Sequence, residues 1–246
     1  MKTARGVEML TLTTTMMGSE STYHPALIWD GDTVILVDTG LPGMLPQIRQ
    51  AVEAAGAALD QVRLVIITHH DLDHIGSLGT IREELGERVK VLAHAVEKEY
   101  ITGAKTPVKM AQMEANLESL PEGARAFYDR MKQGFAVSHA AVDETLTGGQ
   151  QLPYCGGITV IETPGHTPGH ICLYLPSLKT LIAGDALLVE AGDLRVAPAH
   201  INYDMDQYRE SLRKLAGYDI ETVICYHGGI YQGPASQRIA ELAELA

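Results

Sequence analysis

Residues 63 to 76 read RLVIITHHDLDHIG, an apolar run followed at once by a cluster of histidines and aspartates. The β-branched run RLVIIT is typical of a strand that is buried on both faces. Residues two apart in an extended segment point the same way, so His69 and Asp71 can bind one ion. A turn before the next helix would bring Asp73 and His74 toward a second ion. A solvated loop with Asp73 as a helix cap explains this density of ligand types less well.

Three later segments place a histidine or an aspartate just beyond an expected strand. ITVIE at 158–162 leads into TPGHTPGH at 163–170, and the two strands that end at Ala183 and Cys225 precede Asp185 and His227. The prolines and glycines of residues 163–170 allow a loop that holds a histidine rigidly at a strand end. Because layered α/β folds build their sites at strand ends, we expect these residues to share one site.

The order of these motifs resembles the metallo-β-lactamase-fold hydrolase superfamily. The matching motifs are LVDTG at 36–40, THHDLDH at 68–74, PGHTPGH at 164–170, AGD at 183–185 and HGG at 227–229. The resemblance implies an α/β fold, an αββα sandwich of two mixed β-sheets flanked by helices, with a dinuclear metal centre at one edge of the sheets. From the length, we expect residues 1–246 to form a single domain.

The resemblance also implies the ligand set of the two metal ions. The first ion would be bound by His69, Asp71 and His166. The second would be bound by Asp73, His74 and His227, and Asp185 would bridge both ions. Asp38 and His170 are expected to support the ligands by hydrogen bonds. Asp73 is expected to be catalytic as well, by handling a proton while it binds metal.

The sequence departs from the family pattern at Asp71, where most members carry histidine. Asp71, Asp73 and Asp185 would place a charge of about −3 against about +4 from two divalent ions. A carboxylate is a harder ligand than an imidazole and favours Mn²⁺ or Fe²⁺ relative to Zn²⁺. The expected cofactors are therefore two divalent metal ions, zinc in the first place, with manganese or iron as alternatives because of Asp71. An acidic residue here also resembles the flavodiiron branch, which uses iron.

The activity implied by the resemblance is hydrolysis of a small ester, lactone, thioester or related acyl substrate. A hydroxide that bridges the metals would attack the carbonyl carbon, with one metal stabilising the oxyanion. The alternatives are an iron-dependent oxidoreductase of the same fold and a non-catalytic metal-binding sensor. The fold alone does not distinguish them.

A segment of about residues 100–141 carries no strand signal. Met110, Met113, Leu117 and Leu120 recur at helical spacing, which predicts a helical insertion. Its apolar stripe would either pack on the sheet or cover a pocket as a lid. Packing is the preferred interpretation, because most such stripes belong to a core.

Composition narrows the partners and the compartment. Nineteen Lys and Arg against 31 Asp and Glu give a net charge of −12, which disfavours nucleic acid and membrane surfaces. Three scattered cysteines and the absence of a long apolar segment or a signal peptide indicate a cytoplasmic protein. The expected partner is a small acyl compound, and the sequence allows a homodimer.

Overall fold

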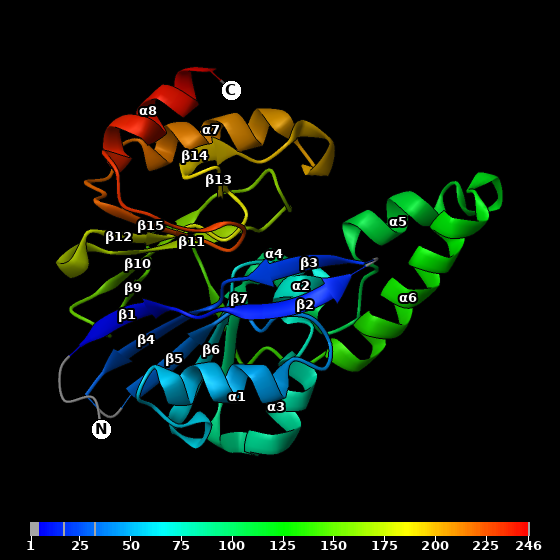
Figure 1. Cartoon of the computed structure of the whole chain (residues 1–246), viewed down its shortest axis with the longest axis horizontal. Coiled ribbons are helices and arrows are strands. Elements are labelled where there is room, and N and C mark those ends of the chain that lie inside the picture. The colour runs from blue at the N-terminus through cyan, green and yellow to red at the C-terminus, as the bar shows by residue number, and fades with distance from the viewer. Residues whose placement is uncertain (1–4, 17, 32, 246) are drawn as a thin grey trace.

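A computed structural model of the chain describes residues 5–16, 18–31 and 33–245. Two six-stranded sheets face each other, and helices cover both outer faces of the pair (Figure 1). Helices α1 (Leu45–Ala54) and α3 (Leu78–Leu85) cover the first sheet, and α7 (Met205–Leu215) and α8 (Ala235–Leu245) cover the second. This arrangement confirms the expected αββα sandwich. The expected absence of a signal peptide concerns the N-terminus, of which residues 1–4 and 17 lie outside the described residues.

The first sheet has the strand order β1-β4-β5-β6-β7-β8. Strands β1, β4 and β5 pair antiparallel, whereas β5, β6, β7 and β8 pair parallel. The bounds are β1 (Gly6–Met9), β4 (Ala26–Asp30), β5 (Thr33–Val37), β6 (Val62–Ile67), β7 (Lys90–His94) and β8 (Glu144–Leu146). The sheet is therefore mixed, as expected.

The second sheet has the strand order β16-β15-β12-β11-β10-β9, in which only β12 and β15 pair parallel. The bounds are β9 (Gln151–Leu152), β10 (Ile158–Glu162), β11 (Ile171–Leu175), β12 (Thr180–Ile182), β15 (Thr222–Cys225) and β16 (Gly229–Tyr231). Two further antiparallel pairs are β2 (Leu12–Met16) with β3 (Ser19–Tyr23) and β13 (Leu187–Glu190) with β14 (Asp193–Val196).

Strand side chains alternate between the two faces of each sheet and fill three apolar layers. In β6, Leu64 and Ile66 belong to the core between the sheets, while Val65 and Ile67 belong to the core beneath α1 and α3. This alternation follows from the two-residue period of a strand. The run RLVIIT is thus apolar throughout because its strand is covered on both sides, as the sequence indicated.

The helical pattern from Ile75 to Leu85 predicts a helix over these residues, and in the structure α3 covers most of them, from Leu78 to Leu85. The short helix α2 (Leu72–Ile75) precedes it and ends before Gly76. A Cβ on Gly76 would lie 2.3 Å from the carbonyl carbon of Leu41. The backbone at residue 41 therefore approaches closely at the point where the two helices separate.

The expected insertion of about residues 100–141 contains α5 (Val108–Glu114) and α6 (Glu122–Ser138), and α4 (Ala95–Ile101) leads into it. Helices α5 and α6 form an arm that projects from the sandwich (Figure 1). Phe135 is buried in the core beneath the first sheet, whereas Phe127 is 40% exposed on the arm. The base of the arm thus packs on the sheet, as preferred above.

No helix among the described residues is long and apolar enough to cross a membrane.

The strand directions bring several strand ends to one edge of the sandwich. Strands β5, β6 and β7 are parallel. In the second sheet β12 and β15 are parallel, and β10 runs in the same direction because two antiparallel pairings separate it from β12. The segments that follow these strands carry the histidines and aspartates singled out in the sequence.

Gly165, in the loop after β10, provides a test of this arrangement. Its φ is +132°, and a Cβ would lie 2.4 Å from backbone atoms of Tyr208 in α7. We expect Gly165→Ala to lower the free energy of unfolding by about 3 kcal/mol or more, from backbone strain and overpacking together. The control is Gly149→Ala. Gly149 also has a positive φ, of +79°, but no atom lies within 4 Å of the added Cβ.

The control should cost only about 1 kcal/mol, the strain of a left-handed alanine. Urea unfolding of both variants measures the difference. Equal losses would show that α7 does not press on the loop as described.

Candidate metal centre

Seven histidines and aspartates gather at this edge in two groups. The first is His69, Asp71, His166 and Asp185, the second is Asp73, His74 and His227, and within each group one possible ligand atom per residue lies within 4.8 Å of the others. Asp185 joins the groups, because its Oδ2 lies 3.4 Å from Nε2 of His166 and 3.4 Å from Nε2 of His227. The structure thus brings together all seven residues that the sequence analysis named as ligands.

Buried polar atoms without a hydrogen bond mark the centre of this cluster. Among the described residues, Nε2 of His69, Nε2 of His74 and Oδ1 of Asp185 are such atoms. A buried polar group without a partner is costly, so native structures rarely retain one. A metal ion in each group, with Asp185 shared between them, would satisfy all three atoms, and the mixture of imidazole and carboxylate suits divalent cations.

Hydrogen bonds at the far side of the rings turn Nε2 toward the cluster. His74 donates from Nδ1 to Oδ2 of Asp38 at 2.9 Å, and His166 donates from Nδ1 to Oδ1 of Asn202 at 3.0 Å. Asp38 is itself fixed by the backbone N–H and the hydroxyl of Thr68, each at 2.8 Å. With the proton held on Nδ1, the lone pair of Nε2 is free for a metal ion.

Asp38 and His170 lie behind the ligands. Asp38 has a φ of +62°, a left-handed conformation that is strained for an aspartate and that its three hydrogen bonds maintain. His170 accepts the backbone N–H of Asp185 at Nε2, at 3.0 Å, and donates from Nδ1 to the hydroxyl of Thr163 at 2.8 Å. Burial lowers the pKa of His170 to about 3, so its ring stays neutral and accepts this bond.

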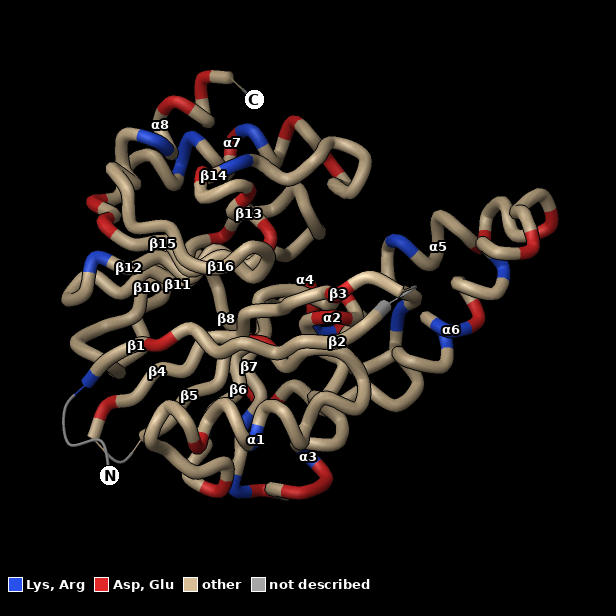
Figure 2. Tube along the Cα trace, viewed as in Figure 1, with Lys and Arg blue, Asp and Glu red and all other residues tan. Residues whose placement is uncertain are grey.

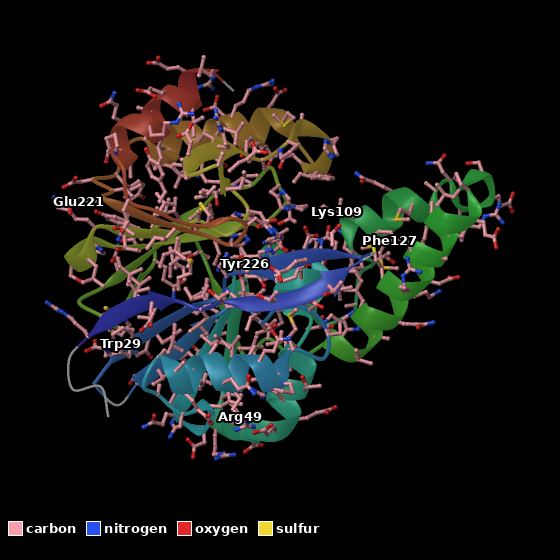
Figure 3. All side chains as sticks on the ribbon, viewed as in Figure 1. Trp29, Arg49, Lys109, Phe127, Glu221 and Tyr226 are labelled. Carbon is pink, nitrogen blue, oxygen red and sulfur yellow. The ribbon has the colours of Figure 1, made fainter. Side chains whose placement is uncertain are left out.

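Tyr226 connects the two sheets beneath the cluster. Its hydroxyl accepts the N–H of Gly40 at 3.1 Å and donates to the carbonyl of Asp73. Its ring lies 3.8 Å from that of His74, measured between centroids. Figure 3 labels Tyr226 near the middle of the molecule, between the two layers. The sequence analysis did not single out this tyrosine, because nothing in the chain pattern separates it from a packed tyrosine.

The three carboxylates make the centre strongly attractive to cations. Burial alone would lower the pKa of His74, but Asp185, Asp38 and Asp73 raise it well above its usual range. In the same way, burial lowers the pKa of His227, and the neighbouring aspartates outweigh it and raise the pKa to about 10. Protons and metal ions therefore compete for these rings, and metal binding must release protons.

Lys109 in α5 points its ammonium into the first group. Its Nζ forms an ion pair with Oδ2 of Asp71 and donates to Nε2 of His166 at 3.2 Å. Burial lowers the pKa of Lys109, but Asp71 raises it by more, so the side chain is a cation. Burial would raise the pKa of Asp71, and Lys109 leads the groups that hold it well below its usual range. Sequence reasoning missed Lys109, because the insertion carries no ligand pattern around it.

Glu97 and His70 join the insertion to the ligand loops. Glu97 in α4 is fully buried and accepts four hydrogen bonds, two from His70, one from the hydroxyl of Thr167 and one from the N–H of Gly169. His70 turns away from the cluster, and its Nε2 accepts the N–H of Val108 at 3.3 Å. The neighbours of His69 and His166 thus meet at one buried carboxylate, and Val108, the neighbour of Lys109, is joined to it through His70. Sequence reasoning missed Glu97 too.

Comparison with known proteins supports the resemblance. The family model described as "Metallo-beta-lactamase superfamily" matches residues 24–227. The "Probable metallo-hydrolase YflN" of Bacillus subtilis (strain 168) is 28% identical over 257 residues, an alignment that covers 99% of this chain and 90% of that protein. A "Hydroxyacylglutathione hydrolase" of Brucella ovis is 26% identical over 168 residues, with 68% of this chain and 48% of that protein covered.

Solved structures show the same architecture. A metallo-beta-lactamase family protein from Thermus thermophilus aligns with a TM-score of 0.71 and 26% identity, covering 98% of this chain and 79% of that chain. The metallo-beta-lactamase FIM-1 from Pseudomonas aeruginosa, solved in its mono-zinc form, aligns with a TM-score of 0.66 and 17% identity over 98% of this chain and 92% of that chain. The second likeness concerns the fold alone.

The Glu97 network predicts a pH-dependent loss of stability. Burial raises the pKa of Glu97, but His70, Thr167 and Gly169 together lower it below its usual 4.5. The carboxylate therefore contributes stability that is fully present above about pH 4.5 and is lost as the pH falls through the lower pKa of the folded state. Glu97→Gln would place an amide NH₂ against N–H donors, at a cost of about 2 to 4 kcal/mol near pH 7.

Urea unfolding at a series of pH values between about 7 and 3 measures this loss, and the difference from the parent should shrink toward acid. The exposed Glu83→Gln serves as the control and should change little at any pH. A loss for Glu97→Gln that is constant with pH would contradict the role given to the carboxylate.

Proposed function

Since this chain belongs to the metallo-beta-lactamase superfamily, we propose that it is a dinuclear metal-dependent hydrolase of a small ester, lactone, thioester or related acyl substrate. The observation that carries the proposal is the pair of ligand groups joined by Asp185. Two of the relatives are named for hydrolysis, a probable metallo-hydrolase and a hydroxyacylglutathione hydrolase, and the chain spans about half of the second.

Each ligand group would hold one divalent cation. His69, Asp71 and His166 would bind the first and Asp73, His74 and His227 the second, with Asp185 between them. When bound, such a pair of cations supplies Lewis acidity, which lowers the pKa of water and polarises a carbonyl group. Four imidazoles among seven ligands favour zinc, and Asp71 makes manganese or iron the alternatives.

The side chain of Asp73 is placed to handle the proton. Its side chain is 25% exposed, against 9% for Asp71 and 8% for Asp185. Its Oδ2 lies 3.3 Å from Nε2 of His227, so one oxygen faces a ligand while the carboxylate remains open to water. A carboxylate that is both fixed and hydrated can accept a proton from the attacking water and pass it on.

A pocket beside the first ligand group would receive the substrate. It has a volume of about 150 Å³, and it is lined by Asp71 and His166 together with residues of α5 and of the segment 200–203. A pocket of this size can receive a small acyl group. Together with the net charge of −12, this supports a small-molecule substrate and not a nucleic acid.

All three cysteines are free and buried, which is consistent with a protein of a reducing compartment. We therefore keep the cytoplasm as the proposed location. The pKa of Cys172 is raised to about 12 by burial, and burial also raises that of Cys225. These thiols are thus poor nucleophiles, and the proposal needs none.

Elemental analysis together with turnover tests the proposal. We expect about two divalent metal ions per chain and hydrolysis of at least one substrate in a panel of lactones, esters and thioesters. A chelator should abolish turnover, and added metal should restore it. Asp185→Asn keeps the size of the side chain but removes the shared charge, so both metal content and turnover should fall.

Other outcomes would replace the proposal. Iron together with oxygen consumption on a thiol substrate would identify the oxidoreductase. Metal without turnover on any acyl compound would identify a sensor. Turnover that survives Asp73→Ala unchanged would remove Asp73 from the reaction.

A further inference from the structure

We infer that Lys109 binds an anionic group of the substrate, so that the substrates of this enzyme are acyl compounds that also carry a carboxylate. The inference rests on the proposed function and narrows its substrate class. It starts from the position of Lys109, which lines the pocket beside the first ligand group and comes from the inserted helix α5. In Figure 3, Lys109 lies at the end of α5 nearer to the two sheets.

A bound metal ion would take both partners of the ammonium. In the structure, Nζ of Lys109 contacts Oδ2 of Asp71 and Nε2 of His166. These residues belong to the first ligand group, and a metal ion there needs the same lone pairs. The side chain of Lys109 is 35% exposed and lines the pocket, so its ammonium stays accessible when it loses both protein partners. The metal-loaded site therefore leaves a cation at the pocket that an anionic group of a ligand can pair with.

The charges around the pocket favour an anionic guest. Among the described residues that line the pocket, Asp71 is the only acidic residue, and Lys109 is the only lysine or arginine. Once the carboxylate of Asp71 serves a metal ion, the remaining charge of the lining is positive. The chain as a whole carries −12, and Figure 2 shows acidic residues spread over both layers and at α2. An anionic substrate therefore needs a local cation in order to bind.

Neighbouring polar groups complete a site for a small oxyanion. Gln112, one turn beyond Lys109 in α5, and the half-exposed Tyr203 also line the pocket. Both can donate hydrogen bonds to carboxylate oxygens. The volume of about 150 Å³ fits a carboxylate with a short carbon chain. A carboxylate a few bonds away from the scissile carbonyl would reach Lys109 while the carbonyl lies at the metal ions.

The fold holds Lys109 in place through its neighbour. The N–H of Val108 is bound by His70, which is fixed in turn by the buried Glu97. The same Glu97 accepts the hydroxyl of Thr167, next to the ligand His166. The position of the cation is thus coupled to the ligand loops, as recognition of a substrate next to the metal ions requires. A lysine that served only as a counter-charge for Asp71 would not need this support.

A matched pair of ligands tests the inference. We would measure binding of 5-oxohexanoate and of the neutral 5-oxohexanamide, a ketone pair that cannot be hydrolysed and in which an amide replaces the carboxylate, to the metal-loaded protein by calorimetry. The para-nitrophenyl esters of glutarate and of glutaramate, one with a free carboxylate and one with the amide, report kcat/KM. The variants are Lys109→Met, Lys109→Arg and, as a control on the same arm, the exposed Lys132→Met.

We expect the parent to prefer the anionic member of each pair. Lys109→Met should weaken 5-oxohexanoate binding and lower kcat/KM for the anionic ester by about 10- to 100-fold, the effect of a lost charge-assisted hydrogen bond. The values for 5-oxohexanamide and for the amide ester should change by less than about threefold. Lys109→Arg should keep part of the preference, and Lys132→Met should keep all of it. Metal content should stay that of the parent in each variant.

Two results would overturn the inference. The first is a parent that binds 5-oxohexanoate no better than 5-oxohexanamide. The second is an equal loss for both ligands in Lys109→Met, which would show that Lys109 acts on the metal site or on folding. Failure of the proposed function looks different, because neither ester would then be hydrolysed although the preference for 5-oxohexanoate and its dependence on Lys109 could still be measured.

Discussion

The burial of three carboxylates at one place is the constraint on which the rest of the structure depends. Asp71 and Asp185 are almost fully buried, and Asp73 lies next to them. Carboxylates cannot leave water without cations or donors to compensate them. In this structure, the compensating cations are the ammonium of Lys109 and the rings of His74 and His227, whose raised pKa values favour their protonated forms. Divalent cations meet it better, because they use the same lone pairs and carry more charge.

The remainder of the fold delivers these groups and holds their orientation. Parallel strands carry the ligands to one edge, and buried bonds behind the rings fix which nitrogen faces inward. Close backbone contacts, such as that between Gly165 and α7, fix the loops. Each supporting residue is costly to change although it touches no substrate. Helix α4, which leads into the helical arm, is also part of this framework, because its Glu97 joins two ligand loops.

Much of this could be predicted from the sequence, and the reason lies in how local each signal is. The run RLVIIT followed by His69, Asp71, Asp73 and His74 places ligands after a buried strand within a few residues, so the pattern is readable in one window. The separation of α2 from α3 at Gly76 was not readable, because it depends on the backbone at Leu41, far away in the chain. Lys109 and Glu97 were missed for the same reason. Their partners, Asp71 and His70, lie 38 and 27 residues away, and no ligand motif surrounds Lys109 or Glu97.

The central claim is that the two ligand groups bind two metal ions that share Asp185. The most direct test is a crystal structure of the metal-loaded protein with diffraction data collected at the absorption edge of the metal. The account predicts two anomalous peaks, one within about 2.0 to 2.3 Å of His69, Asp71 and His166 and the other within that distance of Asp73, His74 and His227, with Asp185 touching both. A single peak, or a first ion without Asp71 among its ligands and with Lys109 still paired to that aspartate, would contradict it.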